Sequence, residues 1–174
     1  MYPQLRNLSQ STQQVVTRLW GSHNSSDRPF WDMMQEEYPV LLLPVMETAS
    51  DWAALTYEEM GDSDYEVEKP KLPTAGALQI SVRWALSGGN SETGLSMLLG
   101  NTQRSVYSAA RDTFVHNASR EQGARFGREY NGDGKCDFCP MLASRGAVYL
   151  TAESAGESTQ FHDNCHCTIS IERP

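Results

Sequence analysis

Residues 123–139 read GARFGREYNGDGKCDFC, and the sequence pattern changes within this stretch. Before Gly123, apolar residues recur at the three- and four-residue spacing of amphipathic helices. After it, polar and apolar residues alternate over 125–130, and the glycine-rich run 131–134 is typical of a turn. Two further short segments, 146–150 and 168–171, have the composition of strands. The sequence therefore predicts an α+β protein, in which a helical N-terminal region is followed by a small β-rich C-terminal module.

The apolar spacing before Gly123 predicts a series of helices, which we place at 4–20, 29–38, 45–60, 75–87 and 102–122, with a short helical turn at 93–99. Pro39 is expected to end the second of these, because proline lacks the amide proton that a helix interior requires. Asn101 or Thr102 is the expected N-cap of the last helix.

On the helix expected at 102–122, the spacing of Val106, Ala110 and Phe114 predicts a buried stripe. Arg104, Tyr107 and Arg111 lie on a neighbouring face, which we expect to be solvated rather than to bind a ligand.

The chain is expected to divide into a helical region at 1–60, an acidic and proline-containing linker at 61–74, a second helical region at 75–123 and a β-rich module at 124–174. The linker reads GDSDYEVEKPKLPT, a composition typical of an extended segment.

The net charge of −8 is unevenly distributed along the chain. Residues 32–68 contain eleven acids and no Lys or Arg. Such a segment repels phosphates and is a poor nucleic-acid surface. Two interpretations are open: a solvated acidic loop, or a docking surface for a basic partner. No apolar run approaches the roughly 18 residues of a membrane span, and the N-terminus lacks a secretory signal, so we expect no membrane association and a reducing compartment.

All four cysteines lie in two groups near the C-terminal end, a C-x2-C at 136–139 and an H-x2-C-x-C at 162–167. Pairs of thiolate and imidazole ligands at such spacings are typical of tetrahedral zinc sites. We expect Cys136 and Cys139 to bind zinc with two ligands from among His162, Cys165 and Cys167. His166 is expected to point away from its neighbours if the segment is extended. A metal would also stabilise a module too small to build a large core.

Three alternatives for the cysteines are less well supported. Disulfides are disfavoured in a reducing compartment. A thioredoxin-like pair lacks its βαβ frame, and a zinc deaminase lacks the upstream H-x-E. The surplus of ligands indicates a closed structural site rather than an open hydrolase site, and no common catalytic motif is present. We therefore expect no enzymatic activity and no small-molecule substrate.

The C-terminal block has the form KCDFCPMLASRGAVY at 135–149 and FHDNCHC at 161–167. It resembles the C-terminal motif of phage head-morphogenesis proteins of the Mu F-like class, also called minor capsid proteins. It is similar in particular to those of tailed phages that infect actinobacteria. The resemblance is close over 124–172, whereas residues 1–123 are similar only in helical character. It carries the metal role to Cys136, Cys139, His162, Cys165 and Cys167, with His166 as a departure that adds a spare ligand.

The resemblance implies a structural component of the virion, made in the host cytoplasm and located at the portal vertex or the capsid interior. Its implied partners are the portal protein, the major capsid protein, or both. The alternative is a zinc-dependent nucleic-acid-binding module that would use Arg104, Arg111, Arg120, Arg125 and Arg128, although the acidic net charge gives DNA contact weak support.

Overall fold

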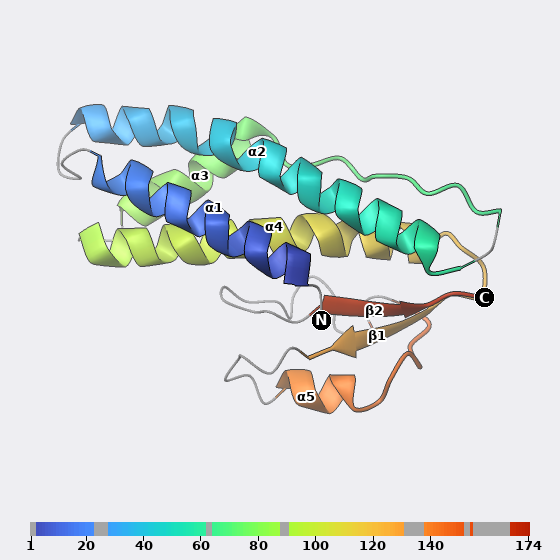
Figure 1. Ribbon diagram of the computed structural model, residues 1–174. Coiled ribbons are helices and arrows are strands. Elements are labelled where there is room, and N and C mark those ends of the chain that lie inside the picture. Colours follow the sequence, from blue (N-terminus) through green and yellow to red (C-terminus); the bar gives the residue numbers. More distant parts are fainter. Residues whose placement is uncertain are drawn as a thin grey trace.

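The computed structural model of the protein describes residues 3–22, 28–61, 64–87, 91–130, 138–151, 154 and 168–174. Its elements are, in chain order, α1 (Pro3–Gly21), α2 (Arg28–Glu59), α3 (Ala75–Leu86), α4 (Ser91–Ala118), β1 (Arg125–Glu129), α5 (Phe138–Ala143) and β2 (Thr168–Glu172). Figure 1 shows the long helices as one layered group, with the two strands and α5 beneath them.

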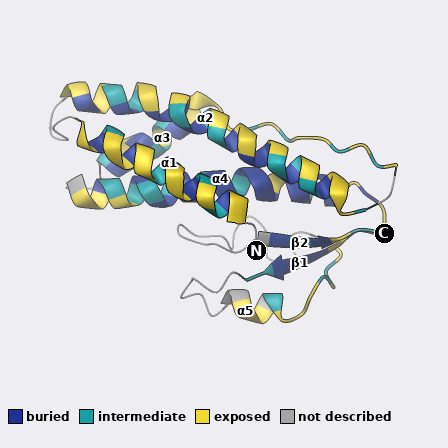
Figure 2. Ribbon diagram, viewed as in Figure 1, coloured by how far each residue is buried: buried dark blue, intermediate teal, exposed yellow. Residues whose placement is uncertain are grey.

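Helices α2 and α4 run side by side in the same direction and form the centre of the helical group (Figure 1). Hydrogen bonds join Tyr38 to Thr102 and Ser50 to Thr113. A later residue of α2 therefore contacts a later residue of α4, as expected for two parallel helices. Helices α1 and α3 run the opposite way and each pack against both central helices. Figure 2 marks buried residues along these helices, and the buried apolar residues of all four belong to one hydrophobic core.

Helix α2 continues through Pro39 and Pro44, so the predicted break at Pro39 is wrong. A proline inside a helix costs about 3 kcal/mol. Against this cost, the helix buries a stripe of residues at three- and four-residue spacing along its whole length, namely Phe30, Met34, Tyr38, Leu42, Met46, Ala49, Ala53 and Tyr57. Full burial of each large apolar side chain contributes about 1.5–3 kcal/mol, so tertiary packing outweighs the two missing hydrogen bonds.

Helix α4 is also continuous, whereas two segments were expected between 93 and 122. Thr102 is not an N-cap: its hydroxyl is fully buried, lies 2.8 Å from the Leu98 carbonyl oxygen and 3.0 Å from the Tyr38 hydroxyl. Gly94 lies inside this helix, at a position where α3 and α1 come too close for a larger residue. A Cβ atom at this position would lie 2.8 Å from the Ala85 carbonyl oxygen and 3.0 Å from the Trp20 ring.

The face of α4 that was expected to be solvated is so at Arg104, which is exposed, and the prediction is wrong for its other two residues. Tyr107 and Arg111 are both only 3% exposed. The Arg111 guanidinium lies over the Tyr107 ring, 5.3 Å from its centroid. This contact offsets part of the cost of burying the charge, because an aromatic ring carries partial negative charge on its face.

The predicted β-rich, zinc-stapled C-terminal module is wrong as a fold class. Most of the described chain is helical, and the described residues after Gly123 form two five-residue strands and the short helix α5. Strand β1 pairs antiparallel with β2, with Phe126 opposite Ile171 and Arg128 opposite Ile169. The strand expected at 146–150 is reduced to a single bridge between Tyr149 and Phe126. The described residues contain no group of three or more His, Cys, Asp or Glu side chains arranged to hold a metal ion.

The strands pack onto the helical group through α4 and β2, with Phe126, Ile169 and Ile171 in the common core. Gly127 is required in β1 because a Cβ atom there would lie 2.6 Å from the Ser170 hydroxyl and 2.8 Å from the Gly146 carbonyl oxygen. The small sheet is thus a layer on the helices.

Candidate functional site

The residues predicted to bind zinc fall largely outside the described part of the chain. Cys136, His162, Cys165, Cys167 and the spare ligand His166 lie outside it, and Cys139 is the second residue of α5, with its side chain not described. The two strands next to the cysteine motifs are described, and their pairing shows where each motif-bearing segment meets the sheet. Glu129, the last residue of β1, is the register partner of Thr168, the first residue of β2. The two motif-bearing segments of the sequence therefore join the sheet at the same end.

A buried polar cluster connects three distant parts of the chain and was not expected from the sequence. Arg173 donates two hydrogen bonds to the Glu121 carboxylate, from Nε to Oε2 at 2.7 Å and from Nη2 to Oε1 at 2.8 Å. Both side chains are almost completely buried, with 2% and 4% exposed. Buried charges are tolerated only when they are paired and hydrogen-bonded, and this bidentate geometry meets that condition.

Tyr57 completes the cluster from the C-terminal end of α2. Its hydroxyl donates to Glu121 Oε2 at 2.5 Å, and its backbone carbonyl accepts a hydrogen bond from Arg173 Nη1 at 2.7 Å. The Arg173 guanidinium also lies 4.6 Å from the centroid of the Tyr57 ring. Burial and the neighbouring Glu121 carboxylate together raise the pKa of Tyr57 far above its ordinary value. We name Tyr57, Glu121 and Arg173 the C-terminal clamp.

A second cluster holds the extended segment 64–74 against α4. The side-chain amide of Asn117 donates from Nδ2 to the carbonyl oxygens of Glu68 and Thr113, at 2.8 and 2.7 Å. Its oxygen accepts from the Glu68 amide at 2.8 Å and from the Tyr65 hydroxyl at 3.1 Å. All four hydrogen-bonding positions of the asparagine side chain are thus used. The segment predicted as a linker is therefore ordered against its own chain.

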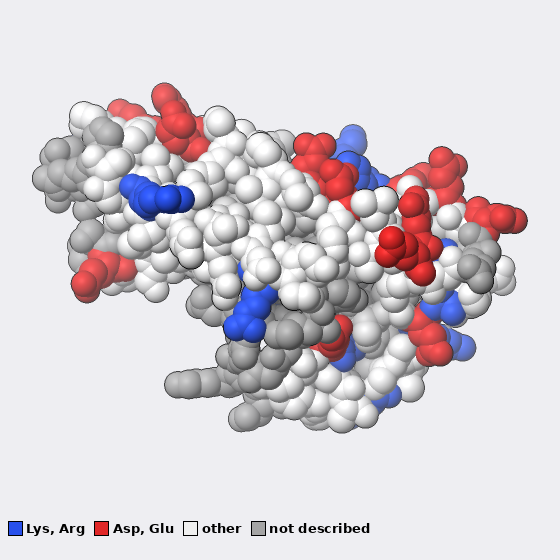
Figure 3. Space-filling model, in the orientation of Figure 1, with Lys and Arg blue, Asp and Glu red and all other residues white. Residues whose placement is uncertain are grey.

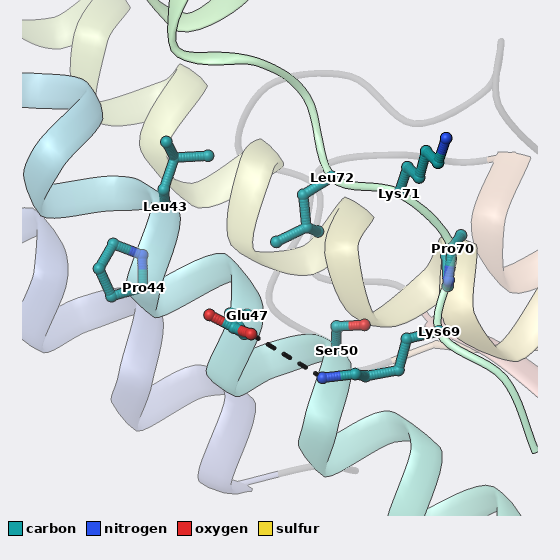
Figure 4. A pocket seen from close by; sticks show the side chains of 8 residues that line it. All are labelled: Leu43, Pro44, Glu47, Ser50, Lys69, Pro70, Lys71 and Leu72. Carbon is teal, nitrogen blue, oxygen red and sulfur yellow. Dashed lines mark ion pairs between the residues drawn. The ribbon is translucent and has the colours of Figure 1, made fainter.

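A cleft of about 480 Å³ lies between α2 and residues 69–72 (Figure 4). Leu43, Pro44 and Leu72 form its apolar walls. Three polar side chains of the cleft, those of Lys69, Glu47 and Ser50, have partners. Lys69 pairs with Asp51 and lies 4.0 Å from Glu47, and the Ser50 hydroxyl is 2.7 Å from that of Thr113. These groups stabilise the contact between α2 and the extended segment, and the cleft offers no arrangement suited to acid–base chemistry.

The arginines proposed for nucleic-acid binding do not form a common surface. Arg111 and Arg128 are 3% and 2% exposed. Arg120 is exposed and donates to His116 Nδ1 at 2.7 Å, and His116 in turn lies beside Glu68. Exposed acids are prominent on the molecule instead. Figure 3 shows them along the side that Figure 1 assigns to α2. None of the helices in the described part of the chain combines the length and apolar character needed to cross a membrane.

A comparison with protein-family models matches residues 2–174 to the family described as VG15 protein, a phage-related family of viral gene proteins. The chain belongs to the VG15 protein family. The match covers the helices, the small sheet and both cysteine motifs, so it applies to the whole molecule rather than to one part. No curated protein and no solved structure was found to match the chain. This VG15 protein is therefore assigned to a phage, while the family description does not itself specify head morphogenesis.

The C-terminal clamp predicts a large loss of stability in Glu121→Gln. The substitution leaves the buried Arg173 charge without its carboxylate, and breaking a buried pair from one side costs about 3–5 kcal/mol. The free energy of unfolding, measured by urea denaturation with circular dichroism, should fall by about this amount. Glu66→Gln is the matched control, because Glu66 is exposed and its loss should change stability by less than about 0.5 kcal/mol. Equal denaturation midpoints for the two variants would contradict the assignment.

The raised pKa of Tyr57 predicts a loss of stability at alkaline pH. In the unfolded chain this tyrosine ionises near pH 10, whereas in the folded protein it stays protonated to higher pH. The unfolded state then binds fewer protons, so the free energy of unfolding falls as pH rises above about 10. Tyr57→Phe should remove up to about 1.4 kcal/mol per pH unit from this slope between pH 10 and 11.5. Parallel curves of stability against pH in wild type and variant would show that Tyr57 is not the group responsible.

Proposed function

We propose that this VG15 protein is a non-enzymatic structural component of the phage head, a minor capsid or head-morphogenesis protein that acts at the portal or the inner capsid surface. The observation that carries the proposal is the family match over 2–174, which assigns the whole chain to a phage-related family. The resemblance of the C-terminal motif at 135–149 and 161–167 to Mu F-like proteins supports the more specific role.

The geometry of the described residues fits a structural role. The buried side chains of Glu121 and Arg173 are paired with each other rather than directed toward a solvent-filled site. Three of the four hydrogen bonds of the Asn117 side chain likewise join backbone groups of its own chain, and the fourth joins the Tyr65 hydroxyl. Such contacts give a rigid shape, which a protein that docks on an assembly requires.

We also propose that the C-terminal cysteines bind a structural zinc ion, with Cys136, Cys139 and two of His162, Cys165 and Cys167 as ligands. The support is their spacing, together with the pairing of Glu129 with Thr168, which starts both motif-bearing segments from one end of the sheet. Thiolate and imidazole are the ligands that zinc prefers in closed tetrahedral sites, where the metal stabilises the fold rather than activating water.

The alternative, a zinc-dependent nucleic-acid-binding module, is weakened by the structure. Two of its five arginines, Arg111 and Arg128, are buried and so do not meet a phosphate backbone. The net charge of −8 adds a long-range repulsion.

The proposed head function predicts that the protein is incorporated into phage particles. The phage that encodes it, with this gene deleted, would be complemented by a tagged copy, and purified procapsids and virions would be probed for the tag. We expect a defined, low number of copies per particle and few viable particles without complementation. Recovery of the tagged protein from the host cytosol alone, with normal particles formed in its absence, would refute the proposal.

The zinc proposal predicts one tightly bound zinc ion per chain. Elemental analysis and native mass spectrometry of the reduced protein should find it, and Cys136→Ser and Cys167→Ser should each lower the zinc content. Because metal binding and local folding are coupled, chelation should also expose the C-terminal region to proteolysis. Metal-free protein whose mass corresponds to two disulfides would overturn the proposal.

A further inference from the structure

Helix α2 has a second, outward surface that is exposed toward both ends of the helix; at its middle, residues 69–72 of the same chain line a cleft with Pro44, and Lys69 pairs with Asp51. Its exposed residues at three- and four-residue spacing are opposite to the buried stripe, and we call them the outer face of α2: Glu36, Glu37, Val40, Pro44, Leu55, Glu58 and Glu59. Val40 and Leu55 are 69% and 61% exposed, the values of side chains largely surrounded by water. Scattered exposed aliphatic residues are ordinary on protein surfaces, so the charges around them decide what the face can bind.

The charge on this face is acidic at both ends, and the basic residues that pair with α2 lie away from these two ends. No Lys or Arg occurs in the sequence between Arg28 and Lys69. Arg28 pairs with Asp32, and Lys69 pairs with Asp51 and lies near Glu47, so the middle of the helix is neutralised. Within the described part of the chain, no ion pair involves the carboxylates of the two end clusters, Glu36 with Glu37 and Glu58 with Glu59.

The dimensions of the face define its partner. A rise of about 1.5 Å per residue places the two acidic ends roughly 33 Å apart, with Val40, Pro44 and Leu55 between them. Charge complementarity requires basic groups at both ends of the occupant and apolar groups between. A helix of about 20–25 residues has this length, and an amphipathic helix presents such groups on one side. Nucleic acid is excluded as the occupant because its phosphates would meet four acids.

We propose that the outer face of α2 docks a basic amphipathic helix of another protein of the phage head. This inference rests on the proposed head function and specifies the surface and the chemistry of the partner. Electrostatic complementarity of this kind directs association and selects partners, while the buried aliphatic residues supply contact area.

The test uses the complementation system with variants of the full-length protein. One variant reverses the charges of the outer face, with Glu36→Lys, Glu37→Lys, Glu58→Lys and Glu59→Lys. Its matched control reverses the same number of exposed acids elsewhere, with Asp64→Lys, Glu66→Lys, Glu92→Lys and Glu172→Lys. We expect the outer-face variant to be incorporated into particles at least tenfold less than wild type, and the control to be incorporated normally.

A second pair of variants tests the apolar part without changing charge. Val40→Ser with Leu55→Ser removes the aliphatic contacts of the outer face. Ile80→Ser with Trp84→Ser is the control, because these α3 side chains are 63% and 51% exposed on a different helix. Circular dichroism of each purified variant verifies that it folds. We expect only the outer-face pair to lower incorporation, by at least threefold.

The outcomes separate this inference from the proposed function. Absence of wild-type protein from particles would refute the head function and, with it, the docking surface. Normal incorporation of both outer-face variants beside wild type would refute the docking surface alone. A photo-cross-linking residue, p-benzoylphenylalanine in place of Val40, then identifies the occupant in particles by mass spectrometry. A cross-linked peptide with Lys or Arg flanking apolar residues at helical spacing supports the proposal. Cross-links to an acidic segment, to a second copy of this chain or to nucleic acid overturn it.

Discussion

The buried ion pair between Arg173 and Glu121 joins the C-terminal strand to the helical group, and the relative position of these two parts depends on it. Apolar contacts between β2 and α4 are non-directional and would tolerate sliding. The bidentate pair has a defined geometry. Tyr57 adds to it, because its hydroxyl donates to the Glu121 carboxylate and its backbone carbonyl accepts from the Arg173 guanidinium. The clamp therefore sets the end of α2, the residues after α4 and the end of β2 in one arrangement.

The parallel contact between α2 and α4 is the second constraint. Buried hydrogen bonds at Tyr38 and Ser50 and the clamp at Tyr57 recur along α2, and each joins a residue 63 or 64 positions later in the chain. A shift of either helix by one turn would leave several buried polar groups without partners, and each such group costs about 1–3 kcal/mol. This registry directs one side of α2 into the core and turns its opposite side, with the acids and exposed aliphatic residues, toward solvent.

The candidate site was predictable from the sequence only in part. The C-terminal cysteine and histidine motifs stand out because ligand spacing is a local property, yet their ligation is still a prediction, since these side chains lie outside the described residues. The clamp could not be predicted, because Glu121 and Arg173 are 52 positions apart and nothing near either residue indicates the other. Arg111 illustrates the opposite error. Its place beside a predicted buried stripe indicated a solvated face, whereas packing over Tyr107 buries it.

The sequence by itself determined α1, α3, β1 and β2, whose bounds agree with the predicted segments to within a few residues. Helical periodicity and strand alternation depend only on residues close together in the sequence, so they can be recognised without knowing the fold. Only the tertiary structure decided that α2 continues through Pro39 and Pro44 and that α4 is one helix. There, the burial of side chains against distant elements outweighs a local interruption. The tertiary structure also decided the extent of the sheet, because a strand forms only where another segment lies within hydrogen-bonding distance. Within residues 146–150, the described bridge to the sheet is the one between Tyr149 and Phe126.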